Sequence, residues 1–499
     1  MARLVTIGDS ISQGFMSGGA ARPDVCYSTF IAEALGLRPG RTYRFGHWPL
    51  GGLPLNFEVL LRHLSKFFGD DIWGPFEWPT AAIRISGFID KLEDYYERGA
   101  GDYRKPFGEV AGLHNLASFG FTVSDAWEVT PEICLQQLEP NGVRPVDDQA
   151  FGTPSDSFYR SAFRTLNPAA ADDRMSFSQL DWVQHYAETD RDGVENLIVW
   201  LGANNALGTI LELKINESKS SLADYQNFGH FDKGGYNLWT EELFAFDYKK
   251  LLERVCGILG DKKHTKKQPD WRVFVATVPA ITIAPLAKGV GLLETRADPF
   301  GVLKRGSAYF EHYTYMIFEQ DAVLAGDVGA LTRDQAYDID VRISKFNQVI
   351  ERLVKERNGA LGEERLHKVD VGDALLRLAL KRNRGNPSYE LPEALKPGGT
   401  ALVDTRYYHA QSDRMTAGGV FSLDGVHPSV IGQGLVAHEF LKVMQGAGRR
   451  IRHPLDWNRI MRLDDLFSRP VDLIQEIYQH DQLARILIRW LRTPDAAVR

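Results

Sequence analysis

The sequence of 499 residues predicts an α/β fold, with a central parallel β-sheet of about five strands that helices cover on both faces. Two observations predict it. Short apolar runs that end in loop residues are typical of buried parallel strands, and they alternate with segments of helical period. The composition, 44% hydrophobic and 25% charged, is that of a globular chain.

Five segments are expected to form the strands. In chain order they are Leu4 to Ile7, Leu113 to Ser118, Leu197 to Leu201, Val273 to Val278 and Leu366 to Val371. Between them, residues 248–259 and 343–354 carry apolar side chains at the i, i+3, i+4, i+7 spacing of amphipathic helices. This alternation indicates right-handed crossovers between parallel strands.

Three polar or small residues follow the carboxyl ends of predicted strands. They are Ser10, Gly120 and Asn204. Loops after parallel strands lie at one edge of an open α/β sheet, where ligands bind. We therefore expect these three residues to lie close together.

Ser10 is a candidate nucleophile, because it follows the first strand in the turn-prone segment Gly8 to Gly14. Glycine permits the tight backbone that presents a side chain at the edge of a sheet. A serine hydroxyl attacks poorly until a base takes its proton. Taken alone, the segment also fits a loop serine or a helix N-cap.

Asp424 and His427 are the candidate base and its partner. Pro428 disfavours a helical conformation for His427, and Asp424 can fold back to the imidazole Nδ1. Nε2 is then free to accept the proton of Ser10. Taken alone, the segment also fits a polar loop whose proline opens a helix at about 428–445.

Gly120 and Asn204 are candidate donors to an oxyanion, which an acyl-transfer site requires. Asn204 offers a side-chain amide directly after the apolar run 197–201. Gly120 offers a backbone N–H that no Cβ obstructs. Each residue alone is also compatible with an ordinary turn.

These four segments, in this order, resemble the blocks of the SGNH hydrolases, also called the GDSL esterase/lipase family. Ser10 matches the serine block, Gly120 the glycine block and Asn204 the Gly-x-Asn-Asp block. Asp424 and His427 match the Asp-x-x-His block. The resemblance covers about half of the chain, in patches.

The resemblance implies a three-layer α/β/α sandwich of flavodoxin-like type. It also implies a triad in which Ser10 is the nucleophile, His427 the base and Asp424 its partner. The implied oxyanion hole consists of the backbone N–H groups of Ser10 and Gly120 and the side chain of Asn204. No metal or cofactor is expected.

Two features depart from the family pattern. Asn205 stands where aspartate is usual, which puts the local hydrogen bonding in doubt. Long insertions are expected near 40–108, 126–190, 206–240, 285–335 and 380–420. Residues 1–445 would then form one SGNH hydrolase domain, although length alone suggests about three domains, and residues 446–499 a helical C-terminal extension.

The expected activity is hydrolysis of a small-molecule, glycan or lipid ester through an acyl-enzyme intermediate. Two alternatives remain open: an acyltransferase with the same triad, and a ligand-binding protein that kept the fold and lost catalysis. A metal-dependent phosphoesterase is disfavoured, because no acidic or histidine cluster has metal-ligand spacing.

Net charge, cysteine content and the length of apolar runs indicate which partners and which location to expect. The net charge of −7 argues against nucleic-acid binding, and three widely spaced cysteines indicate no disulfide framework. With no recognisable signal peptide and no apolar run of about 20 residues, a cytoplasmic protein without a transmembrane segment is expected.

Two segments each allow more than one interpretation. The aromatic-rich insertion at 40–108 fits either a lid over the substrate or a small satellite core. Near the C-terminus, Leu483, Ile486, Leu487, Trp490 and Leu491 form an apolar stripe. Such an amphipathic helix would lie on a membrane surface, in a dimer interface or against its own domain.

Overall fold

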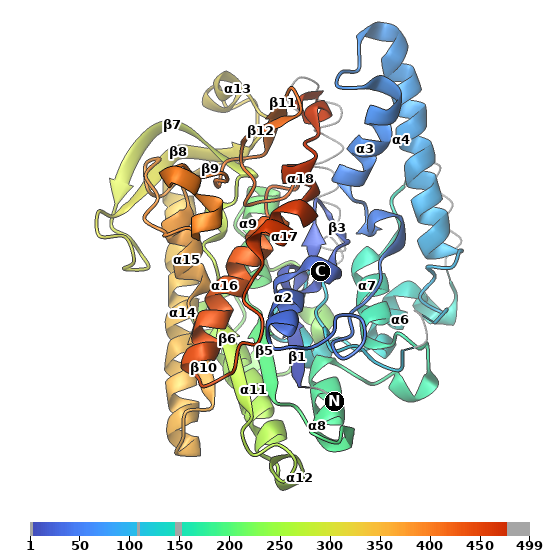
Figure 1. Ribbon diagram of the computed structural model, residues 1–499, viewed down its shortest axis with the longest axis vertical. Helices are drawn as coiled ribbons and strands as arrows, with labels where there is room; N and C mark the ends of the chain where they lie inside the picture. The colour runs from blue at the N-terminus through green and yellow to red at the C-terminus, as the bar shows by residue number, and fades with distance from the viewer. Residues whose placement is uncertain (1–2, 107–109, 145–151, 477–499) are drawn as a thin grey trace.

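The computed structural model describes residues 3–106, 110–144 and 152–476. Its centre is a parallel sheet in the order β1-β5-β6-β10, with helices packed around it (Figure 1). The four strands are β1 (Leu4–Gly8), β5 (Asn196–Trp200), β6 (Arg272–Ala276) and β10 (Leu366–Val369). The mixed α/β class with a central parallel sheet is therefore confirmed.

Successive side chains of the strands enter two different cores, as the two-residue period of a strand requires. One face of the sheet packs against α8 (Gln179–Thr189), α11 (Glu241–Gly260) and α14 (Arg333–Leu361). The other face packs against α2 (Tyr27–Ala34), α15 (Val371–Leu378) and α16 (Val430–Gly446). Both faces are thus covered by helices.

The predicted strand at 113–118 is wrong as a full strand of the sheet. It runs beside β1 and forms a single parallel bridge, between Thr6 and Asn115. The side-chain amide of Gln179 donates to the carbonyl oxygens of Leu116 and Gly8, both at 2.9 Å. The backbone N–H of Ser118 still reaches the carbonyl oxygen of Gly8 at 3.3 Å, so the segment follows β1 without forming a regular ladder.

Short elements near the start of the chain surround the first strand. They are α1 (Ser10–Gln13) and the antiparallel strands β2 (Phe15–Met16), β3 (Gly19–Ala20) and β4 (Leu53–Pro54). Two longer helices follow, α3 (Phe57–Phe68) and α4 (Gly74–Glu97). The pair projects from the body at the upper right of Figure 1.

The other predicted insertions carry most of the remaining elements. Before and after β5 lie α5 (Asp125–Glu128), α6 (Pro131–Leu138), α7 (Ser157–Leu166), α9 (Asn204–Glu212), α10 (Leu222–Tyr225) and α12 (Lys262–Thr265). Later come α13 (Gln320–Leu324) and the antiparallel strands β7 (Ala287–Arg296), β8 (Ser307–Tyr315), β9 (Leu331–Thr332), β11 (His409–Gln411) and β12 (Arg414–Ala417).

The aromatic-rich insertion contributes much of a third core, which residues from later segments complete. Trp48 and Phe57 are buried in it, together with the apolar faces of α3 and α4. By contrast, Phe67, Trp73 and Phe76 are 49%, 78% and 87% exposed. The insertion therefore contains a satellite core and also presents aromatic side chains to solvent.

The described part of the C-terminal extension contains α17 (Trp457–Leu463) and α18 (Asp465–Ser468). The apolar stripe predicted at 483–491 lies outside the described residues. Within the ranges that the structure covers, no helix has both the length and the apolar character needed to cross a bilayer.

Candidate active site

Ser10 lies where β1 ends and α1 begins. Gly8 makes the turn possible, because a Cβ there would lie 2.4 Å from Ser12 Oγ. The Asp9 carboxylate caps α1 by accepting the N–H of Ile11 at 3.2 Å. The turn therefore presents the Ser10 hydroxyl at the carboxyl end of the strand, where the side chain is 5% exposed.

His427 joins Ser10 to Asp424, although the two ends of the chain supply these residues. Its Nε2 lies 2.9 Å from Ser10 Oγ, and its Nδ1 lies 3.1 Å from Asp424 Oδ2. A proton on Nδ1, directed at the carboxylate, leaves Nε2 as an acceptor for the serine proton. The structure thus brings the three predicted triad residues together in the order that proton transfer needs.

The Asp424 carboxylate is held by the backbone around it. Its Oδ1 accepts the N–H groups of Val426 and His427, and its Oδ2 accepts that of Gly18, all at 2.8 Å. Burial alone would raise the pKa of Asp424, but His427 and the backbone donors outweigh it and lower this pKa. Asp424 is therefore charged at neutral pH.

The turn between β2 and β3 clamps the loop that carries Asp424. The Ser17 N–H donates to Ser422 Oγ at 2.8 Å, and Ser17 Oγ accepts the N–H of Leu423 at 3.2 Å. Gly18, the next residue, donates to Asp424 as described above. Sequence reasoning missed this turn, whose one visible signal is its place just after the serine motif.

One phenylalanine lies beside the imidazole, and a second lies against the first. The centroid of the Phe15 ring is 4.6 Å from that of His427 and 5.1 Å from that of Phe119. Such apolar walls keep water from the imidazole and so strengthen its electrostatic contacts. No motif pointed to either residue.

Two of the three predicted oxyanion donors, Gly120 and Asn204, are tied to one loop. Gly120 lies in it with a φ of +80°, in the left-handed region that glycine favours. The Asn204 amide donates to the carbonyl oxygen of Phe121 at 2.9 Å, and Gln13 Oε1 accepts the N–H of Phe119, also at 2.9 Å. An amide NH₂ has two N–H groups, so this bond uses one of those that Asn204 offers.

Two more buried amides connect the motifs. Asn205 Oδ1 accepts the N–H of Val123 at 3.2 Å, so the residue that departs from the family pattern still serves as an acceptor. Gln433 of α16 donates to the carbonyl oxygen of Ile11 at 3.2 Å and accepts the N–H of Tyr27 at 3.0 Å. Helix α16, which begins three residues after His427, therefore connects α1 and α2.

Asp9 lies next to the nucleophile and is buried. Burial raises the pKa of Asp9 to about 7, although the N–H of Ile11 and the charge of His427 act in the opposite direction. Asp9 therefore changes its charge near neutral pH, close to the imidazole.

Metal ions need sets of ligands, which side chains outside the triad would have to supply. Among the described residues, no group of three or more His, Cys, Asp and Glu side chains could hold a metal ion. His230 contacts Asp125 at 2.7 Å, and His114 accepts the N–H of Arg44 at 2.9 Å. Both histidines are thus held in local polar contacts.

Comparison with known proteins finds no match of this chain to a protein-family model, to a curated protein or to a solved structure. The case for a function therefore depends on the side chains around Ser10.

Proposed function

We propose that this protein is a serine hydrolase of the SGNH type, which cleaves carboxylic esters through an acyl-enzyme intermediate. The observation that carries the proposal is the hydrogen-bonded path from Asp424 through His427 to Ser10 Oγ, with steps of 3.1 and 2.9 Å. A serine needs such a path to lose its proton as it attacks a carbonyl.

The reaction has two halves. In the first, Ser10 Oγ attacks the ester carbonyl carbon while His427 Nε2 takes the serine proton. The tetrahedral oxyanion is stabilised by the N–H groups of Ser10 and Gly120 and by the amide of Asn204. His427 then protonates the leaving alcohol. In the second half, His427 deprotonates water, which attacks the acyl-enzyme carbonyl, and then gives this proton to Ser10 Oγ as the acid is released.

The order of the strands supports this proposal. With the bridged segment 113–118 beside β1, the spatial order is 113–118, β1, β5, β6, β10. That is the doubly wound order 2-1-3-4-5, in which ligands bind at the carboxyl ends of the strands. Under the proposal, the helices on the two faces are the outer layers of a three-layer α/β/α sandwich.

Acyl transfer to an alcohol is the second candidate. Ser10 and His427 are 5% and 7% exposed, and Phe15, which contacts Phe119, lies beside the imidazole. Because little water reaches such a site, an alcohol that packs against its apolar walls is favoured over water as the acyl acceptor. Ester formation in the presence of added alcohols distinguishes it from simple hydrolysis.

The test is a panel of p-nitrophenyl esters of graded acyl length, measured with wild type and with Ser10→Ala. We expect Ser10→Ala to lower kcat/KM by about 10⁴-fold or more, because the nucleophile is lost. A fluorophosphonate should label wild type at Ser10, as mass spectrometry of the peptides would detect.

Ser12→Ala is the matched control, since it removes a hydroxyl from the same helix. Ser12 Oγ contacts the hydroxyl of Tyr27 at 2.7 Å, away from the triad. It should therefore keep most of the activity and the label. Undiminished activity in Ser10→Ala would rule the proposed mechanism out.

A further inference from the structure

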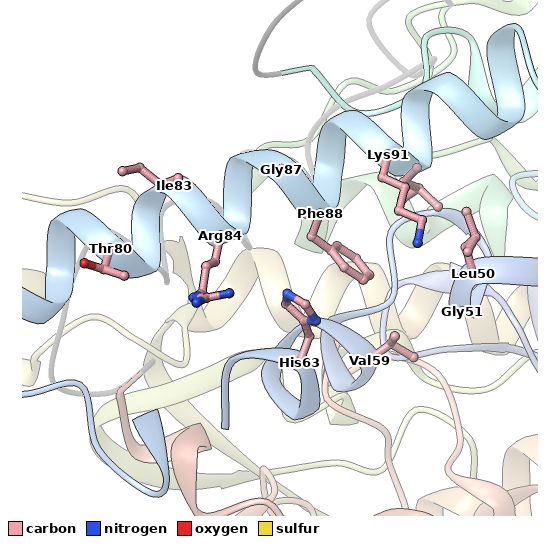
Figure 2. A pocket seen from close by; sticks show the side chains of 11 residues that line it. Leu50, Gly51, Val59, His63, Thr80, Ile83, Arg84, Gly87, Phe88 and Lys91 are labelled. Atoms are coloured by element: carbon pink, nitrogen blue, oxygen red, sulfur yellow. The ribbon is translucent and has the colours of Figure 1, made fainter. Parts of the chain in front are cut away.

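A groove of about 670 Å³ lies between α3 and α4, apart from the Ser10 site. Figure 2 shows Arg84, Phe88 and Lys91 of α4 reaching toward His63 and Val59 of α3. Its volume is in the range of small-molecule pockets, about 300–1,000 Å³. None of the residues that line it belongs to the predicted triad or oxyanion hole.

Cations without carboxylate partners line the groove. Neither Arg84 nor Lys91 forms an ion pair with any residue in the ranges that the structure describes. The guanidinium of Arg84 lies over the ring of Phe67, 3.3 Å from its centroid, and its buried Nε has no acceptor among the described residues. Because no carboxylate in the described part of the chain neutralises these two cations, an anion in the groove would form charge-assisted hydrogen bonds with their N–H groups.

The charge of the groove also acts on His63. Burial comes first, and then the neighbouring cations Lys66, Arg84 and Lys91, in lowering the pKa of His63. Lys66, Arg84 and Lys91 therefore all lie close enough to His63 to disfavour its charged form.

Apolar side chains form much of the remaining lining. Val59 and Phe88 contribute to the walls, and the Phe88 ring lies 5.5 Å from that of His63. Ile83, on the rim, is 73% exposed. A free inorganic anion would leave this surface in contact with water, whereas a ligand with an apolar chain would cover it.

Gly87 keeps the groove open. On α4, residues 80, 83, 84, 87, 88 and 91 share one helical face, and Gly87 is near its centre. A Cβ on Gly87 would meet no atom within 4 Å. Glycine in the middle of a helix costs about 1 kcal/mol relative to alanine. The chain therefore keeps an unfavourable residue at the position where a side chain would fill the cavity.

From these observations we infer that the α3–α4 groove is a binding site for a single-chain anionic amphiphile, whose carboxylate meets Arg84 and Lys91 and whose alkyl chain lies on Val59 and Phe88. The site is separate from the ester hydrolase proposed above and does not depend on it.

The test is calorimetric titration of the full-length protein with dodecanoate, below its micellar concentration. Wild type should bind it with saturation. Acetate, which lacks the chain, and dodecyltrimethylammonium, which reverses the charge, should bind at least tenfold more weakly. Equal binding of the cationic surfactant would overturn the inference, as would the absence of saturable dodecanoate binding.

Two variants locate the ligand. Arg84→Gln combined with Lys91→Gln should weaken dodecanoate binding at least tenfold, because it removes both charges. Lys249→Gln combined with Lys304→Gln, at exposed positions elsewhere, is the matched control and should bind as wild type does. Equal weakening in both pairs would show a nonspecific charge effect and overturn the site.

Gly87→Leu tests the cavity without the risk of unfolding, since leucine is the better helix former. It should abolish saturable dodecanoate binding, and binding equal to that of wild type would overturn the inference. Ser10→Ala should bind as wild type does. Loss of binding in Ser10→Ala would place dodecanoate in the Ser10 site instead, so the two proposals can fail separately.

Discussion

The imidazole of His427 is fixed through both nitrogens and one face. Its nitrogens lie within hydrogen-bond distance of Ser10 Oγ and Asp424 Oδ2, and its ring contacts Phe15. Three backbone N–H groups hold the Asp424 carboxylate in turn. The base therefore has its orientation before any substrate enters, which is how positioned groups lower a barrier.

Asp9 gives a testable dependence of stability on pH. Burial raises its pKa to about 7 from the ordinary 3.8. The folded state thus keeps a proton that the unfolded chain loses, so the stability contributed by protonated Asp9 is complete below about pH 4 and is lost as the pH rises through 7. The loss amounts to about 4 kcal/mol. Asp9→Asn, which resembles the protonated form, should match wild type near pH 4 and exceed it at pH 8.

Urea unfolding at both pH values measures this difference in the free energy of unfolding. Asp413→Asn, at an exposed position, is the control and should change stability little at either pH. If Asp9→Asn shifts the free energy of unfolding equally at pH 4 and pH 8, Asp9 does not carry a raised pKa.

The residues of the triad could be predicted from the sequence, whereas most of those that hold them could not. Ser10, Asp424 and His427 lie in short motifs whose spacing reflects their chemistry. Gln13 and Gln433 act by bonding backbone groups of distant segments, 106 and 422 residues away. A buried amide of this kind leaves no local pattern, because its partner is chosen by the fold.

Helix α1 carries the nucleophile and also holds the loop that contains Gly120. Gln13, at its end, accepts the N–H of Phe119 at 2.9 Å and donates to Ser161 Oγ at 2.8 Å. We expect Gln13→Leu to free this loop and lower kcat about 10- to 100-fold with little change in KM. That corresponds to about 1.4–2.7 kcal/mol of lost transition-state stabilisation.

Steady-state kinetics on the best ester of the panel would measure the effect. Gln137→Leu, in α6, is the control, because its amide donates to Asp156 and does not contact the Gly120 loop. A rise in KM at unchanged kcat in Gln13→Leu would mean that Gln13 supports substrate binding and not the oxyanion donor.

The elements that were hard to predict depend on contacts that are distant in sequence. The apolar run at 113–118 has the pattern of a strand, but Gln179, 63 residues beyond Leu116, takes a carbonyl that would extend the ladder. The insertion at 40–108 could be a lid or a core, and most of the residues that pack against it come from segments about 200 to 400 positions later, some of them near the C-terminus. Periodicity reports which face of an element is apolar and not which partner covers it.

Both ends of the chain build the central region and the third core. α1 and α2 meet α16 through Gln433, and α3 meets the C-terminal extension through Arg62. The Arg62 guanidinium donates to the carbonyl oxygens of Asp465 and Arg469, both at 2.9 Å. The extension therefore packs against the insertion at 40–108, so both segments contribute to the fold of the whole molecule.

This packing predicts that a cavity near the C-terminus loosens the α3–α4 hairpin. Leu473 is fully buried in the third core with Leu60 and Leu64 of α3. Leu473→Ala should lower the free energy of unfolding by about 2–5 kcal/mol. Hydrogen exchange should become faster in α3 and α4 before it does in β1, β5 and β6, because the sheet has separate cores.

Leu324→Ala, at a half-exposed position, is the control and should leave hydrogen exchange in α3 and α4 unchanged. Unaltered protection of α3 and α4 in Leu473→Ala would mean that the hairpin is held without the C-terminal extension.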